Sequence, residues 1–174
     1  MSKNILLTSP PGVGKTTVIE RLIERLCDLK PMGFYTREIR EGKNRVGFSL
    51  MGLDGTESIL SHTHLVSPYR VGRYKVDVNG FEKFLDHLDL LNSPSSIAII
   101  DEIGKMECLS HKFQKIITQL FESEKTIVAT IAIKGGGFPA KIRKRKDCSL
   151  IHLSKENRDL MPKRLEEMVR KWRQ

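Results

Sequence analysis

Hydrophobic residues follow two kinds of spacing along this chain. Continuous apolar runs at 5–7, 97–100 and 126–133 predict strands buried on both faces. Apolar residues at helical spacing begin at Val18 and return between the later runs. This alternation indicates an α/β fold, in which helices cover both faces of a mainly parallel sheet. The predicted helices lie near 18–29, 80–91, 110–123, 140–146 and 158–172, and a further strand is predicted at 148–153.

The segment 34–60 has the pattern of strands joined by short turns. Two extended stretches, 34–40 and 45–53, are separated by turn-forming residues, and a second turn at 54–55 leads to a third strand near 57–60. We therefore expect an antiparallel meander that extends the parallel sheet.

Residues 61–75 show no hydrophobic period and contain proline and glycine. They predict a loop placed to lie over a site. Its two histidines, His62 and His64, lack acidic or cysteine partners, so we expect them to be solvated rather than bound to a metal. Three glycines at 135–137 predict a flexible break.

Length and composition favour one domain over 1–174. A chain of 174 residues can bury about 70% of its unfolded surface, and no repeat or linker divides it. Three cysteines without a C-x-x-C pair argue against a disulfide framework or a zinc site and favour the reducing cytoplasm. The first apolar run is too short for a signal peptide, and no run approaches the ~20 residues of a membrane span. We expect a cytoplasmic protein with no membrane partner, and the sequence leaves the oligomeric state open.

The net charge of +9 is concentrated in two basic segments, 141–146 and 170–173. Such runs form either solvated helix faces or contacts with phosphates or nucleic acid. The chain has no RNA-recognition aromatic motif, and aromatic residues make up only 6% of it. The solvated face is therefore favoured, and nucleic-acid binding is the minor alternative.

The first strand, turn and helix carry a phosphate-binding pattern at 4–17, NILLTSPPGVGKTT. It matches G-x-x-x-x-G-K-[ST], in which turn residues free backbone N–H groups for phosphate oxygens. We expect Lys15 to reach the β- and γ-phosphates of a nucleoside triphosphate and Thr16 to ligate Mg²⁺. The alternative is an ordinary strand-to-helix turn with an exposed lysine. Ser9 replaces the first glycine, which implies either an ordinary backbone angle there or strain. The predicted loop comprises Ser9, Pro10, Pro11, Gly12, Val13, Gly14, Lys15, Thr16 and Thr17.

The run 97–100 leads into two carboxylates, Asp101 and Glu102. Buried strands of an open α/β sheet present such groups at the edge where ligands bind. We expect Asp101 to hold Mg²⁺ together with Thr16, and Glu102 to be the base that aims a water at the γ-phosphorus. The alternative is a pair of acidic residues at the start of a helix.

Polar residues near this acidic pair supply further candidates. Lys105 is a candidate for stabilising charge on the transferred phosphoryl group, and Glu107 for orienting Lys105 or the water shell of the metal. Both are equally consistent with surface positions. Thr130 either senses the γ-phosphate or is satisfied within its own strand.

Several segments together resemble the cancer-related nucleoside-triphosphatase family. The matching segments are PPGVGKTT (10–17), GFYT (33–36), RVGRYKVD (70–77), DEIGKME (101–107) and KENR (155–158). The resemblance implies a three-layer, RecA-like P-loop fold with an additional strand. It also implies slow Mg²⁺-dependent hydrolysis of ATP, GTP and other nucleoside triphosphates.

Carried over by position, the resemblance adds a second segment to the nucleotide site. Here Cys108 stands where leucine is common in the family, which changes only the packing. The added residues are Asp101, Glu102, Ile103, Gly104, Lys105, Met106, Glu107 and Cys108.

A last turn holds Asn157 and Arg158, which are candidates for contact with the nucleobase. With Ser154 the same residues equally resemble the start of a helix. Arginines in the meander and the aperiodic segment are further candidates for phosphate contact, and the sequence does not place them. They are Arg37, Arg40 and Arg73.

These observations predict a Mg²⁺-dependent nucleoside-triphosphate hydrolase. The first alternative is a small-molecule or nucleotide kinase, with segment 141–146 as a lid over an acceptor. The second is a nucleic-acid-associated nucleotide switch with a basic interface.

Overall fold

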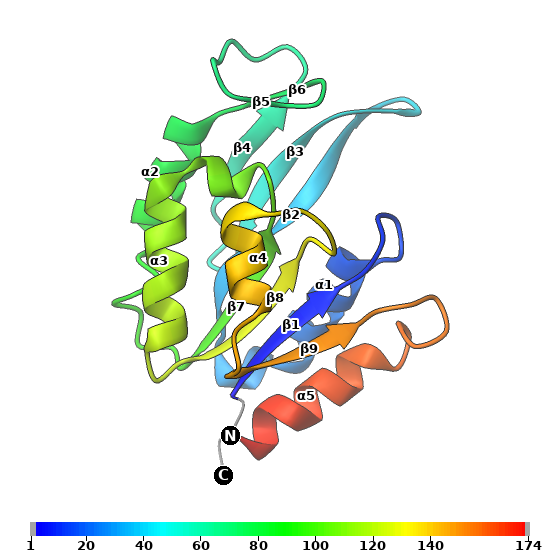
Figure 1. Cartoon of the computed structure of the whole chain (residues 1–174), viewed down its shortest axis with the longest axis vertical. Helices are drawn as coiled ribbons and strands as arrows, with labels where there is room; N and C mark the ends of the chain where they lie inside the picture. The colour runs from blue at the N-terminus through cyan, green and yellow to red at the C-terminus, as the bar shows by residue number, and fades with distance from the viewer. Residues whose placement is uncertain (1–2, 173–174) are drawn as a thin grey trace.

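Within residues 3–172, the part of the chain that the computed structural model describes, nine strands form one sheet (Figure 1). The strand order is β5-β6-β4-β3-β2-β7-β8-β1-β9. Strands from β2 to β9 in this order pair in parallel, and the remaining strands pair antiparallel. The parallel strands are β1 (Asn4–Thr8), β2 (Met32–Glu41), β7 (Ile97–Ile103), β8 (Thr126–Ile131) and β9 (Cys148–His152). The antiparallel strands are β3 (Asn44–Gly52), β4 (Glu57–His62), β5 (Arg70–Val71) and β6 (Tyr74–Val76).

Helices cover both faces of this sheet, so the molecule has three layers (Figure 1). Helices α1 and α5 pack on one face, and α2, α3 and α4 pack on the other. The bounds are α1 (Lys15–Arg25), α2 (Val78–Leu88), α3 (His111–Glu122), α4 (Gly137–Arg143) and α5 (Met161–Lys171), with 3₁₀ turns η1 (Cys27–Leu29) and η2 (Glu107–Leu109).

The strand sequences account for the two apolar layers. In β1, Ile5 and Leu7 pack toward α1 and α5, whereas Leu6 packs toward the other helices. Successive side chains of a strand point to opposite faces, so a fully apolar strand fills both layers at once. Side-chain caps begin helices α2 and α3. Asp77 accepts a hydrogen bond from the Gly80 amide at the start of α2, and Ser110 accepts one from the Phe113 amide at the start of α3.

Strand β8 lies between β1, which precedes the phosphate-binding loop, and β7, which carries the acidic pair. This is the additional strand implied by the family resemblance. The carboxyl ends of these three parallel strands meet at one edge of the sheet. The predicted α/β fold, its antiparallel extension and its helices on both faces are confirmed.

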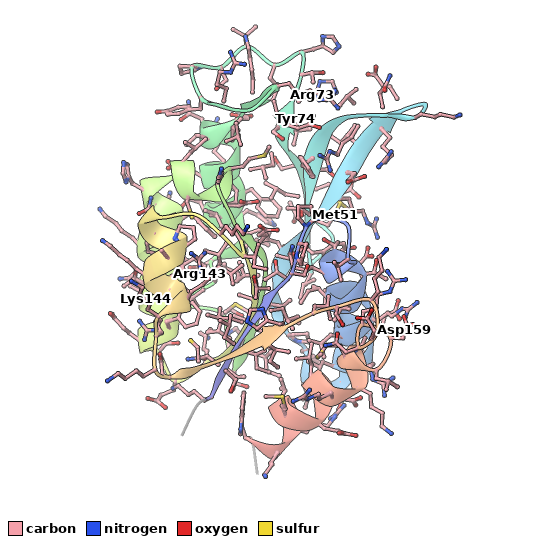
Figure 2. All side chains as sticks on the ribbon, turned by 45° about the vertical axis from the view of Figure 1, so that its right-hand side comes forward. Met51, Arg73, Tyr74, Arg143, Lys144 and Asp159 are labelled. Atoms are coloured by element: carbon pink, nitrogen blue, oxygen red, sulfur yellow. The ribbon has the colours of Figure 1, made fainter. Side chains whose placement is uncertain are left out.

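The expectation of a structureless segment at 61–75 is wrong in part. Strand β4 runs on to His62, and the short strands β5 and β6 form a hairpin that pairs with β4. Arg73 and Tyr74 lie at this end of the sheet (Figure 2). Strands of two and three residues are too short to display a hydrophobic period.

The predicted bounds of four helices also differ from the structure. Helix α2 covers 78–88 rather than 80–91. The first helix ends at Arg25, and a separate 3₁₀ turn follows it. Helix α4 covers 137–143 rather than 140–146, so its first turn uses Gly137 from the predicted glycine break. Helix α5 starts at Met161 rather than 158, because residues 155–160 form a turn and Pro162 fits the first helical turn.

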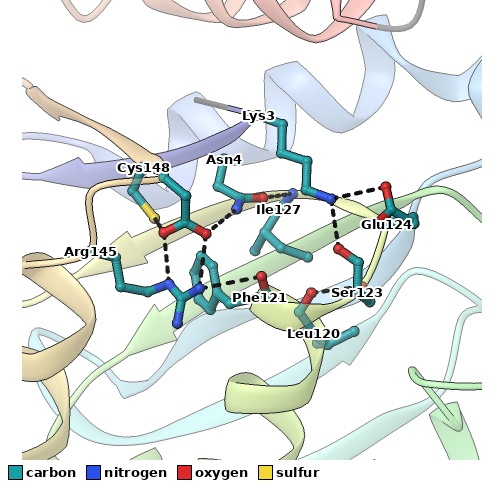
Figure 3. Close-up of polar contacts among 10 residues, drawn as sticks. Lys3, Asn4, Leu120, Phe121, Ser123, Glu124, Ile127, Arg145 and Cys148 are labelled. Atoms are coloured by element: carbon teal, nitrogen blue, oxygen red, sulfur yellow. Dashed lines mark hydrogen bonds and ion pairs between the residues drawn. The ribbon is translucent and has the colours of Figure 1, made fainter. Parts of the chain in front are cut away.

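Part of the basic segment 141–146 is engaged by the fold. The Arg143 guanidinium donates to the carbonyls of Ala132 and Gly135, each at 2.6 Å. Arg145 pairs with the Asp147 carboxylate at 2.9 Å and lies over the Phe121 ring (Figure 3). These two cations therefore stabilise the connections around α4.

No helix among residues 3–172 is long and apolar enough to cross a membrane.

Candidate active site

The loop from Ser9 to Thr17 connects β1 to α1 at the carboxyl edge of the sheet. Gly12 and Gly14 have φ of +77° and +109°, in the left-handed region that favours glycine. Gly14 is the N-cap of α1, so the amides of the first helical turn are left without intrahelical partners. Free amides and the positive end of the helix dipole attract an anion.

Ser9 occupies its position without backbone strain. Among residues 3–172, Lys30 and Asp89 are the non-glycine residues with positive φ, so Ser9 has an ordinary backbone angle. Its side chain is buried, and its hydroxyl donates to the Pro10 carbonyl at 2.9 Å. Of the two outcomes considered for this departure from the pattern, the unstrained one is observed.

The Lys15 side chain crosses the loop from the start of α1. Its Nζ lies 3.5 Å from the Ser9 carbonyl oxygen and 3.4 Å from the Ser9 hydroxyl. The same Nζ lies 3.9 Å from a carboxylate oxygen of Glu102. Lys15 thus spans the space between the loop and the acidic strand.

Asp101 joins three elements of the site. The Thr16 hydroxyl donates to its Oδ2 at 2.8 Å, and the Thr130 hydroxyl donates to its Oδ1 at 2.5 Å. Burial raises the pKa of the Asp101 carboxyl, and hydrogen bonds from both threonines and from the Thr36 backbone act against this rise. The phosphate loop and the acidic strand therefore meet at one carboxylate. Thr130, for which the sequence left two interpretations, is one of its donors.

Two further carboxylates lie beside Asp101 at the end of β7. The Glu102 side chain is 31% exposed, and burial raises its pKa while Lys15 acts against the rise. Glu107 is 5% exposed, and burial together with the charge of Glu102 raises its pKa to about 8. A Cβ at Gly104 would lie 2.9 Å from Glu107 Oε2 and 3.1 Å from Glu102 Oε1. Both carboxylates thus border the space that the missing Cβ leaves at Gly104.

Other residues of the acidic motif lie in different surroundings. The Ile103 side chain is fully buried in the core beneath α2 and α3, and Met106 and Cys108 pack against that core. The Lys105 side chain is exposed to solvent. Burial raises the pKa of the Cys108 thiol to about 12. In the phosphate loop, Val13 likewise packs into the core on the α1 side. Ile103, Cys108 and Val13 therefore position the motifs rather than point into the site.

A pocket of about 430 Å³ opens between the phosphate loop and strands β2 and β3. Its wall contains Glu102 and the loop residues Pro11, Gly12, Gly14, Lys15, Thr16 and Thr17. The opposite wall holds Thr36, Arg45 and Phe48, which the sequence analysis missed. Their strands reach the site because β2 pairs with β7, with Phe34 opposite Ile100. The segment GFYT is the sequence signal that could have indicated this wall.

The arginine candidates have different places. Arg37 lines the pocket and pairs with Glu20 on α1 at 3.1 Å. Arg40 pairs with Glu38 at 2.6 Å, and Arg73 donates to the Arg45 carbonyl, so neither is brought to the phosphate loop.

The predicted nucleobase contacts lie in the turn before α5. The Arg158 guanidinium donates to the Val13 carbonyl of the phosphate loop at 3.0 Å. The Asn157 side chain instead binds the turn itself, donating to the His152 carbonyl at 3.0 Å and accepting from the Ser154 amide at 2.9 Å. The structure therefore brings Arg158, but not Asn157, into contact with the loop.

Known proteins are similar to this chain in both sequence and fold. A family model described as NTPase matches residues 4–166. The nucleoside-triphosphatase THEP1 of Thermotoga maritima is 44% identical over 156 residues, which cover 89% of this chain and 88% of that protein. The human cancer-related nucleoside-triphosphatase is 38% identical over 93% of this chain and 94% of its own length.

Solved structures agree with these sequence matches. The crystal structure of THEP1 from Aquifex aeolicus superimposes with a TM-score of 0.85 at 34% identity, covering 95% of this chain and 98% of that one. The solution structure of the human protein gives 0.82 at 35% identity over 97% of each chain. The chain therefore belongs to the nucleoside-triphosphatase family, as its motifs predicted.

Proposed function

We propose that this protein hydrolyses nucleoside triphosphates to diphosphates and inorganic phosphate, with Mg²⁺ and with little selectivity for the base. The hydrogen bond from Thr16 to Asp101 carries the proposal, because it joins the phosphate loop to the acidic strand. The names of the relatives, which are nucleoside-triphosphatases, support the same activity.

The residues around Asp101 fit a magnesium ion. The Thr16 hydroxyl gives its hydrogen to Asp101, which leaves its oxygen lone pairs for a cation. Mg²⁺ prefers oxygen ligands and is commonly bound by one or two protein groups together with substrate phosphates. Residues 3–172 contain no group of three or more His, Cys, Asp or Glu that could hold a metal alone, which suits such a shared site. When bound, the ion would neutralise charge between the β- and γ-phosphates.

The protein groups divide the remaining work. The loop amides and Lys15 bind the β- and γ-phosphates. Glu102 accepts a hydrogen bond from a water and orients it in line with the γ-phosphorus, a role in which position matters more than basicity. Arg158 buttresses the loop through Val13 and lies beside it for contact with the nucleotide. A site that contacts mainly the phosphates of a nucleotide discriminates poorly between bases.

Phosphate release from ATP, GTP, CTP and UTP by the purified protein tests this proposal. We expect all four to be hydrolysed in the presence of Mg²⁺, with rates within about tenfold of one another, because base contacts are few. Chelation of Mg²⁺ with EDTA should stop the reaction, and so should Lys15→Ala, whereas Lys83→Ala, at an exposed position on α2, should not. Release that continues with EDTA or in Lys15→Ala would exclude the mechanism.

The three free cysteines suit the cytoplasm, where we place this activity.

A further inference from the structure

A second pocket adjoins the phosphate pocket on the other side of Glu102. It has a volume of about 280 Å³ and shares Thr36, Phe48 and Glu102 with the phosphate pocket. The Glu102 carboxylate is thus in the wall of both. A group bound in the second pocket would meet the same carboxylate that faces the phosphate end of a bound nucleotide.

The walls of this second pocket are mainly apolar. Leu60 of β4, Val71 of β5 and Met106 line it together with the Phe48 ring. Val71 belongs to the segment 61–75, so the hairpin of β5 and β6 closes this side of the site. Water is the only co-substrate that hydrolysis requires, and it needs no apolar cavity of this size.

Three ionisable side chains line the second pocket: Glu102 and Glu107 next to the phosphate pocket, and Lys105, which is exposed to solvent. Glu107 is buried beside Glu102, and burial together with the charge of Glu102 raises the pKa of its carboxyl to about 8, which favours the neutral form at pH 7. A neutral carboxyl allows an apolar body to bind without the cost of an unpaired buried charge. Glu102, which faces Lys15, remains the proton acceptor at the junction.

We propose that this pocket binds a neutral alcohol with an apolar body and that the protein transfers the γ-phosphoryl group to its hydroxyl. The inference rests on the proposed nucleotide site and adds a second substrate to it. The alcohol oxygen forms a bond to the γ-phosphorus, and the bond from that phosphorus to the β,γ-bridging oxygen breaks. The hydroxyl proton passes to Glu102, and the products are a phosphate monoester and a nucleoside diphosphate.

The second pocket can be probed with benzyl alcohol, cyclohexylmethanol and 1-hexanol. The full-length protein is incubated with Mg²⁺, γ-labelled ATP and one alcohol, and the labelled monoester and inorganic phosphate are quantified. A bound acceptor reacts at a high effective concentration, so for at least one alcohol the product ratio should exceed the molar ratio of alcohol to water by at least about a hundredfold. Ratios that only match the molar ratio for all three alcohols would overturn the proposal.

A matched pair of variants links transfer to the pocket. Val71→Trp fills the cavity, and the ratio of monoester to inorganic phosphate should fall at least about tenfold. Val66→Trp makes the same change at a side chain that is 98% exposed in the same segment, and the ratio should be unchanged. An equal ratio in both variants would show that the alcohol reacts from solution.

A second measurement covers the case in which Val71→Trp does not fold. Benzyl methyl ether has a similar apolar body but no hydroxyl, and it should compete with benzyl alcohol and lower monoester formation. No competition would contradict binding in the pocket. Full hydrolysis without any monoester would refute the acceptor site alone, whereas loss of both reactions in the wild-type protein would refute the proposed hydrolase as well.

Discussion

Glu102 is the residue on which the proposed chemistry depends most directly. Its carboxylate lies 3.9 Å from Lys15 Nζ, whereas the hydrogen bond that joins the loop to the acidic strand runs from Thr16 to Asp101, so a neutral replacement should leave the binding groups in place. We expect Glu102→Gln to lower the turnover number at least about a hundredfold, which is the usual contribution of a general base. Nucleotide affinity should change less than about threefold, since the amides and Lys15 remain.

Phosphate release and equilibrium binding of a fluorescent nucleotide separate these two effects. Glu124→Gln is a matched control, because Glu124 is fully exposed, pairs with Lys3 and precedes β8, at the edge of the sheet opposite the loop. Wild-type turnover in Glu102→Gln would show that another group orients the water.

Glu107 makes a separate prediction about stability and pH. Its pKa is about 8 in the folded protein and about 4.5 in the unfolded chain, so the folded state holds a proton that the unfolded state releases between these values. The contribution of Glu107 to the free energy of unfolding is therefore largest below pH 4.5 and falls as the pH rises toward 8. Glu107→Gln removes this ionisation. Between pH 5 and pH 8, the free energy of unfolding of wild type should therefore fall by about 2–4 kcal/mol more than that of the variant.

Urea unfolding at pH 5 and pH 8 measures this change. Glu124→Gln again serves as the control, since it makes the same substitution at a fully exposed position. Parallel pH dependence in wild type and Glu107→Gln would mean that Glu107 is already ionised in the folded protein at neutral pH.

Elements differed in how far the sequence could predict them. The phosphate loop and the acidic strand follow from local patterns, because their chemistry is contained in a few adjacent residues. The wall formed by Thr36, Arg45 and Phe48 could not be found in this way, since it depends on β2 pairing with β7 more than 60 residues along the chain. The second pocket depends in addition on Val71, in a strand of two residues.

The approach of β2 to β7 makes a prediction at the level of elements. Gly33 has φ of +129°, and a Cβ there would lie 1.8 Å from the Ile99 carbonyl oxygen. Gly33→Ala must therefore push apart the two strands that join the meander to the parallel sheet, and we expect a loss of at least about 3 kcal/mol of unfolding free energy.

Gly136→Ala is the matched control for this change. It has φ of −96°, and no atom lies within 4 Å of an added Cβ, so its loss should stay below about 1 kcal/mol. Urea unfolding of both variants decides the matter. A Gly33→Ala protein as stable as the control would show that β2 and β7 are not in such close contact.

For the molecule as a whole, we predict that the site and the core belong to one folding unit. The phosphate loop, the acidic strand and the meander come from distant parts of the chain. All three are part of, or directly follow, strands of the same sheet. A nucleotide that binds across them stabilises only the folded state, by about 2.7 kcal/mol at a hundred times its dissociation constant. For a domain of this size we expect the melting temperature to rise by about 5–10 °C.

Thermal melts followed by far-ultraviolet circular dichroism and by Trp172 fluorescence test both the binding and the unity of the domain. Trp172 is the single tryptophan and packs with the core of the α1 and α5 layer, whereas circular dichroism reports on all helices and strands. With Mg²⁺ and a non-hydrolysable ATP analogue, the two signals should shift together, because one cooperative unit unfolds in one transition. The shift should vanish in Lys15→Ala and persist in Lys83→Ala, since only Lys15 lies in the loop. Two separate transitions, with only one shifted by the nucleotide, would mean that the meander or the α5 side folds independently of the phosphate site.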